Sequence, residues 1–175
     1  YACDQLHGEW MFLLGDDHTF DPDILLRLLS HKLPAVCALN ISRHAPFHPL
    51  FYRGKLGEMP VQIEWDEVPV GHGLWYLPAD LHIGNNGLLI QRAVLDKIEK
   101  PIWRAGQIHP GILNEDFWFW HSVREQLGLP VVVDLGAPMG HLNSFAAQPG
   151  QRNGKWTVVL AQNGKPVFEK LPAQK

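Results

Sequence analysis

The chain has 175 residues, of which 46% are hydrophobic and 19% are charged, and its formal net charge at pH 7 is −3. This is the composition of one ordinary globular domain. Its 15 basic residues are scattered and form no basic stripe, so we exclude a generic nucleic-acid binder. The longest apolar runs fall far short of the ~20 residues that a membrane-spanning helix needs, so we expect no transmembrane segment.

The two cysteines predict a cellular compartment, and the first residues predict whether the chain is a fragment. Cys3 and Cys37 lack CxxC spacing, and we expect both to be reduced thiols in a cytoplasmic protein. The chain opens at Tyr1 with no initiator methionine, no signal-like segment and no preceding strand. We therefore expect an amino-terminally truncated fragment.

The first elements in chain order are two buried strands with a helix between them. An apolar run over residues 10–14 is typical of a buried strand. Asp21 predicts the N-cap of a helix that continues to Ser30, with leucines at helical spacing, and Pro34 ends it. A second buried strand is predicted over residues 35–39.

Further strands and helices alternate along the rest of the chain. Residues 61–65 alternate like a half-buried strand, and residues 88–90 predict a strand that leads into a helix over residues 91–99. A longer helix is predicted from Glu115 to Leu127, followed by a strand over residues 131–133. The order is that of a mixed α/β protein.

An acidic corner follows the first predicted strand, where Gly15 precedes Asp16, Asp17 and His18. Ligands of open α/β sheets bind at the carboxyl ends of strands. Two adjacent carboxylates repel each other unless a cation or hydrogen bonds compensate, and their oxygens with an imidazole suit Mg²⁺ or Mn²⁺. The corner therefore indicates a metal or phosphate site, and the alternative is a turn whose acids cap the next helix.

Two acids, Glu115 and Asp116, begin the long predicted helix. The helix dipole stabilises ionised carboxylates at this position, and an ionised carboxylate can act as a general base. Acids at helix starts are also common as simple capping residues, so the local sequence leaves both interpretations open.

A glycine and asparagine segment precedes the strand at residues 88–90. Its small residues let backbone approach a ligand closely and its amides offer directional hydrogen bonds, while a simple turn explains the same residues equally well. The four residues are Gly84, Asn85, Asn86 and Gly87.

The order of these pieces over residues 9–142 resembles a family 2-type glycosyltransferase of the GT-A fold. The matching pieces, in order, are the acidic corner, Phe20-x-Pro22-Asp23 with its leucine-rich helix, the segment from Gly84 to Arg92, Asn114-Glu115-Asp116, and Val133-Asp134 with Gly140-His141. The resemblance implies an α/β fold, with a GT-A-like mixed sheet flanked by helices and lacking its first strands. It implies a partial glycosyltransferase domain over residues 1–145 and a C-terminal β-hairpin extension over residues 146–175, turning at Asn163-Gly164.

The resemblance also implies roles for single residues. Asp17 is the first candidate ligand of Mn²⁺ or Mg²⁺, His141 completes the metal site and His18 is an alternative ligand. Asp116 is the base that deprotonates the acceptor hydroxyl, with Glu115 as second choice. The residues expected to contact the nucleotide-sugar donor are Asp16, Gly84, Asn85, Asn86, Gly87 and Arg92.

The implied activity is metal-dependent transfer of a sugar from a nucleotide-diphosphate sugar to a hydroxyl of a carbohydrate, lipid or protein acceptor. Transfer is expected to be inverting, and non-processive because the Gln-x-x-Arg-Trp motif is not present. Gly15 stands where many relatives carry the first Asp of a D-x-D motif, and the strands that grip the nucleotide base are missing, so activity of this fragment alone stays open. The alternatives are a non-catalytic carbohydrate or nucleotide-sugar binding module and a metal-dependent hydrolase.

Overall fold

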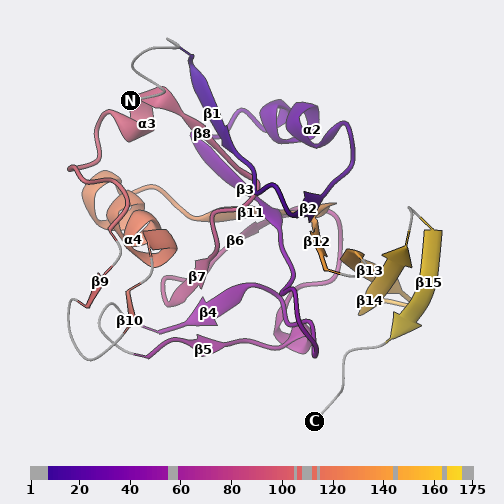
Figure 1. Ribbon diagram of the computed structural model, residues 1–175. Helices are drawn as coiled ribbons and strands as arrows, with labels where there is room; N and C mark the ends of the chain where they lie inside the picture. Colours follow the sequence, from indigo (N-terminus) through magenta and orange to yellow (C-terminus); the bar gives the residue numbers. More distant parts are fainter. Residues whose placement is uncertain are drawn as a thin grey trace.

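The computed structural model describes residues 8–54, 59–104, 106–107, 112–113, 115–143, 146–162 and 165–170. Within these residues the strands form four sheets, two of five strands, one of three and one of two. Figure 1 shows one five-stranded sheet at the centre of the view and the other at its right. Within the described ranges, no helix is long and apolar enough to span a membrane.

The central sheet has the order β1-β8-β3-β11-β6. Its strands are β1 (Trp10–Leu13), β8 (Leu88–Gln91), β3 (Ala35–Leu39), β11 (Val132–Pro138) and β6 (Leu74–Tyr76). β3 and β11 run parallel, and the other neighbours in this sheet run antiparallel. Every residue of β3 is buried, which explains its unbroken apolar sequence.

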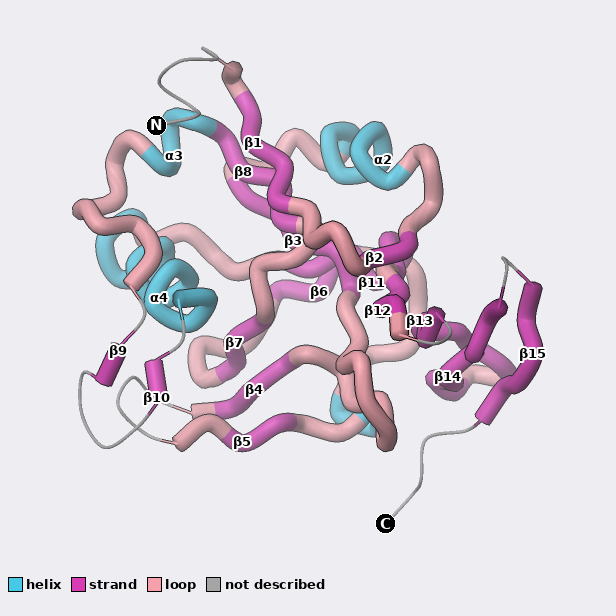
Figure 2. Tube along the Cα trace, in the orientation of Figure 1, coloured by secondary structure: helices cyan, strands magenta, loops and turns pink. Residues whose placement is uncertain are grey.

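Helices pack on both faces of this sheet (Figure 2). On one face, Val36 of β3 packs in the same apolar cluster as Leu28 of helix α2 (Ile24–Ser30). On the other face, Cys37 belongs to the main core together with Trp120 of helix α4 (Glu115–Leu127). Alternation along a strand places neighbouring residues on opposite faces, so β3 is the centre of both clusters.

A small antiparallel sheet lies beside the main core, in the order β5-β4-β7. Its strands are β5 (Val61–Gln62), β4 (Phe51–Arg53) and β7 (Leu81–Ile83). The predicted strand over residues 61–65 ends early because Trp65 begins a 3-10 helix, η1 (Trp65–Glu67), whose Glu64 and Glu67 form a capping box. The remaining two-stranded sheet pairs β9 (Gly106–Gln107) with β10 (Ile112–Leu113).

The C-terminal residues complete an antiparallel sheet with the order β15-β14-β13-β12-β2. Its strands are β2 (His18–Thr19), β12 (Gly140–Leu142), β13 (Ala146–Arg152), β14 (Lys155–Gln162) and β15 (Lys165–Lys170). β14 and β15 pair as the hairpin prediction requires, while the Asn163-Gly164 turn lies outside the described residues. β12 pairs with β13 across the predicted boundary at residue 145, so the C-terminal strands continue a sheet that begins next to the acidic corner.

The predicted fold class, an α/β protein of the GT-A fold, is wrong. The described part of the chain is mostly β, with fifteen strands, three α-helices and one 3-10 helix. The predicted helix over residues 91–99 shrinks to one turn, α3 (Arg92–Leu95). Many strands span only two or three residues, too short to show the period-two pattern that identifies a strand in a sequence.

A buried carboxylate ties α2 to the central sheet. Asp134 of β11 is fully buried and accepts hydrogen bonds from Arg27 Nε at 2.6 Å and from His31 Nε2 at 2.7 Å. The backbone N–H of Gly136 also donates to Asp134, at 2.8 Å. Burial alone would raise the pKa of Asp134, but the bonds from Arg27 and His31 outweigh it and lower this pKa.

We expect Asp134→Ala to destabilise the fold by about 3 kcal/mol, because it leaves Arg27, His31 and the Gly136 N–H without their acceptor. Urea unfolding at pH 7 measures this loss. Asp23→Ala is the control, since Asp23 is exposed and makes no side-chain cap bond on α2. A loss below about 0.5 kcal/mol, the usual range for surface substitutions, would show that Asp134 does not anchor α2.

Candidate metal centre and adjoining pocket

The structure brings Asp17, His18 and His141 together. β1 ends at Leu13, the chain turns through the acidic corner, and β2 then pairs with β12 so that His18 lies opposite His141. The ring centroids of the two histidines are 4.2 Å apart. One ligand atom from each of the three side chains lies within 4.8 Å of the others, which is close enough for all three to hold one metal ion.

His18 has the properties of an unused ligand. Its side chain is 2% exposed, and neither ring nitrogen makes a hydrogen bond, although Nδ1 lies 2.8 Å from Asp17 Oδ1. Burial, and to a smaller extent His141, lowers the pKa of His18 to about 4, against the opposing charge of Asp16. The imidazole is therefore neutral at pH 7, and a neutral ring offers a lone pair to a metal.

His141 is oriented by the backbone. Its Nδ1 lies 3.0 Å from the carbonyl oxygen of Ile41, and a carbonyl can only accept a hydrogen bond. In the neutral ring this bond places the proton on Nδ1 and the lone pair on Nε2, which lies 3.3 Å from Asp17 Oδ2. A lone pair facing a carboxylate oxygen needs a cation between or beside the two atoms, and this place suits a guanidinium as well as a divalent ion.

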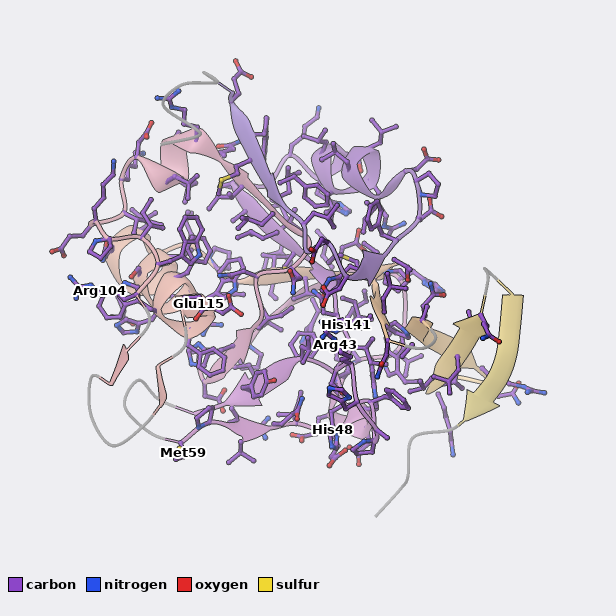
Figure 3. All side chains as sticks on the ribbon, in the orientation of Figure 1. Arg43, His48, Met59, Arg104, Glu115 and His141 are labelled. Carbon is purple, nitrogen blue, oxygen red and sulfur yellow. The ribbon has the colours of Figure 1, made fainter. Side chains whose placement is uncertain are left out.

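Arg43 is the third contact of the Asp17 carboxylate and was not found from the sequence. Its guanidinium forms an ion pair with Asp17, and its Nη2 lies 3.4 Å from His141 Nε2. Figure 3 shows Arg43 and His141 next to each other near the centre of the view. The sequence signal was only that Arg43 follows the second predicted strand, as Asp16 and Asp17 follow the first.

Gly15 is part of this packing. A Cβ at this position would lie 2.7 Å from His18 Nδ1 and 3.0 Å from Asn86 Oδ1, so the corner has no room for a side chain there. The interpretation that Gly15 weakens the acidic motif by replacing an Asp is therefore revised. Here the glycine lets His18 and Asn86 approach the corner from two sides.

We expect Gly15→Ala to weaken Mn²⁺ binding by about tenfold, because the added methyl displaces the His18 ring from its ligand position. Isothermal titration calorimetry with MnCl₂ measures the change. Gly73→Ala is the matched control, because a Cβ there meets nothing within 4 Å. Unchanged Mn²⁺ affinity in a folded Gly15→Ala protein would show that His18 is not held by this contact.

A pocket of about 380 Å³ opens beside the corner, with Gly15 in its wall. It combines apolar residues of β1 with amides and acids from later in the chain. The lining residues are Leu13, Leu14, Gly15, Asn85, Asn86, Trp103, Glu115 and Asp116. The predicted acids of α4 and the predicted amide segment therefore face one space.

Asp116 is a carboxylate with a raised pKa at the wall of this pocket. Burial, with a smaller contribution from the charge of Glu115, raises the pKa of Asp116 to about 6, although the amide groups of Asn85 oppose the shift. Its carboxylate lies over Gly84, where an added Cβ would be 3.5 Å from Asp116 Oδ2. Glu115 is exposed at the pocket, and Asn114 lies outside the described residues.

The segment from Gly84 to Gly87 is a turn that is held in place by two hydrogen bonds to other parts of the chain. Asn40 Nδ2 donates to the carbonyl of Asn86 at 2.7 Å, and the N–H of Gly87 donates to Leu13 O at 2.8 Å. Gly87 has a φ of +70°, which favours glycine. The side chain of Asn85 is 8% exposed and faces the Asp116 carboxylate, and its amide oxygen has no hydrogen-bond partner.

Of the six predicted donor-binding residues, only Asn85 and Asn86 line this pocket, and Arg92 and Asp16 lie apart from it. Arg92 follows the far end of β8, where its Nε lies 3.4 Å from Asp96 Oδ2 and it lines a different pocket. The four residues of β8 separate Gly87 from Arg92, a length of about 14 Å. Asp16 is exposed at the corner and is not a member of the three-residue cluster.

Trp103 is a pocket residue that the sequence did not reveal. On α4, the aromatic side chains of Phe117, Phe119 and Trp120 are buried in the core. Trp103 instead lines the pocket and stacks on Phe119, with ring centroids 5.5 Å apart and an interplanar angle of 12°. The only signal was a tryptophan two residues after Pro101, in a segment without periodicity.

The chain matches no family model and no curated protein. Among solved structures it is similar to A197 from STIV, a viral protein, with a TM-score of 0.54 and 15% sequence identity. The match covers 94% of this chain and 72% of A197. This likeness shows a shared fold alone.

Proposed function

We propose that the protein transfers a sugar from a nucleotide-diphosphate sugar to an acceptor hydroxyl, with a divalent cation held by Asp17, His18 and His141. The observation that carries the proposal is a pocket that adjoins the cation cluster. Asp116, a carboxylate with a pKa of about 6, lines this pocket together with Gly15, and Gly15 packs directly on His18 of the cluster. A base in a pocket and a cation site next to that pocket are the two parts that this reaction needs.

The cation side of the pocket is suited to a departing diphosphate. A bound Mn²⁺ or Mg²⁺ supplies positive charge where negative charge develops on the leaving phosphate oxygen. Asp17 contributes the anionic ligand, while the bond from His141 to Ile41 O holds Nε2 in the ligand tautomer. The neutral state of His18 keeps a third lone pair available at pH 7.

The base side is suited to an acceptor hydroxyl. With a pKa of about 6, Asp116 is ionised at pH 7 and is more basic than an ordinary aspartate. It would accept the proton of the hydroxyl as that oxygen attacks the sugar carbon from the face opposite the diphosphate, which inverts the anomeric centre. The amide of Asn85 lies beside Asp116 and would offer its oxygen to sugar hydroxyls, and Trp103 offers a ring for a sugar face.

A cytoplasmic location is part of the proposal. Cys37 is a free, buried thiol whose Sγ lies 3.4 Å from the carbonyl oxygens of Gly84 and Asn86. Free thiols persist in reducing compartments. Cell fractionation with immunoblotting should find the protein in the cytosolic fraction, and recovery from the culture medium alone would contradict this location.

The experiment is a mass-spectrometric screen of the purified protein against UDP-, GDP- and dTDP-sugars with Mn²⁺ and a panel of hydroxyl acceptors. We expect a transfer product that disappears when EDTA replaces Mn²⁺. Hydrolysis of the donor without transfer would favour a metal-dependent hydrolase. Mn²⁺-dependent binding of a nucleotide sugar without turnover would favour a binding module.

A further inference from the structure

We propose that the guanidinium of Arg43 occupies the cation position of this site, gives way to the divalent ion when that ion binds, and then binds the anionic diphosphate. The inference rests on the proposed function and adds the regulation of the same site. Arg43 is then both a competitor of the free metal and a partner of the metal-bound phosphate.

The contacts of Arg43 are those of a cation in the ligand cluster. Its guanidinium pairs with Asp17 and lies 3.4 Å from His141 Nε2, the lone-pair atom of that ring. Asp17 Oδ2 takes part in the contacts with both Arg43 and His141. A metal ion bound to Asp17 and His141 would need the same oxygen and the same nitrogen.

The guanidinium of Arg43 and a divalent ion cannot occupy the site together, because both are positively charged. Arg43 neutralises the single negative charge of Asp17, whereas a divalent ion at Asp17 would leave a guanidinium in the same place facing a double positive charge. Like charges at contact distance repel strongly, so metal binding drives Arg43 off the carboxylate.

The surroundings of Arg43 allow it to move. Its side chain is 42% exposed, and it lies in a loop closed at its base by the bridge between Ile41 and Pro49. His44 and Ala45, the next two residues, are exposed as well. When the metal ion displaces Arg43, its guanidinium stays at the edge of the site. There it can bind a phosphate group of the metal-bound diphosphate through two parallel hydrogen bonds.

The test is calorimetric titration of the folded protein with MnCl₂ alone, and then with micromolar pyrophosphate at saturating Mn²⁺. Arg43→Gln should bind Mn²⁺ about tenfold more tightly than the unmodified protein and bind pyrophosphate about tenfold more weakly, changes of about 1.4 kcal/mol in opposite directions. Arg43→Met, which keeps an apolar stem of similar reach, should change both affinities in the same directions. Arg53→Gln is the control, because Arg53 pairs with Glu67 and Asp80 instead.

Weaker or unchanged Mn²⁺ binding by both Arg43 variants, or no Mn²⁺ binding by any of the proteins, would overturn the exchange. So would unchanged pyrophosphate affinity in both variants. Because these titrations require no turnover, they separate the inference from the proposed function. Opposite affinity changes without sugar transfer would remove only the transferase proposal, and sugar transfer with unchanged affinities would remove only the role of Arg43.

Discussion

Asp116→Asn is expected to reduce sugar transfer by about 10²–10⁴-fold, the range that a general base contributes. The amide keeps the shape of the carboxylate but cannot accept the proton of the acceptor hydroxyl. Donor binding should be unchanged, because the proposed donor diphosphate lies at the other side of the pocket. Initial rates with saturating donor measure the effect, and near-normal turnover would reject Asp116 as the base.

The same substitution is expected to stabilise the protein at pH 7, by about 2 kcal/mol. Folding raises the pKa of Asp116 from its ordinary value near 3.8 to about 6, so the folded state loses stability as the pH rises through that window. Asparagine carries no charge to desolvate and removes this loss. Urea unfolding at pH 7 should show the gain in Asp116→Asn, and Glu115→Gln, at an exposed position, should show little change.

The pH dependence of sugar transfer is an independent test of Asp116 as the general base. The rate should rise with pH through about 6, as the base becomes ionised, and then level off until another group titrates. A rate that stays constant between pH 5 and pH 7 would contradict the assignment.

Asp17→Asn is expected to weaken Mn²⁺ binding by at least about 100-fold, since it removes the only anionic ligand of the described cluster and leaves two histidine ligands. Transfer should fall with it, because the diphosphate leaving group loses its counter-charge. Asp16→Asn is the matched control, because Asp16 is exposed and outside the cluster. Equal Mn²⁺ affinities for the two variants would contradict the ligand role of Asp17.

The sequence predicted the long elements better than the architecture. The apolar runs gave β1 and β3, and Glu115 to Leu127 forms the predicted helix α4 with the same bounds. The short strands depend on pairing with strands distant in the sequence. β12 has three residues and β2 has two, and they are strands only because they pair with each other and β12 with β13.

The residues of the candidate site, too, were predicted only in part from the sequence. Asp17 and His141, which were predicted to share one site, lie close together because Asp17 directly precedes β2, whose His18 pairs with His141 of β12. Arg43 and Trp103 could not be found, since both lie in loops whose path depends on the whole fold. The raised pKa of Asp116 and the burial of the Asn85 amide beside it depend on tertiary packing, which a sequence motif does not encode.

The most direct measurement is anomalous X-ray diffraction from crystals of the protein grown with Mn²⁺. We predict one strong manganese peak within about 2.0–2.3 Å of a carboxylate oxygen of Asp17 and of Nε2 of His141, with a ring nitrogen of His18 as a further ligand. A site with no peak at saturating Mn²⁺, or a peak bound elsewhere while these three side chains keep their present contacts, would contradict a metal centre at this corner.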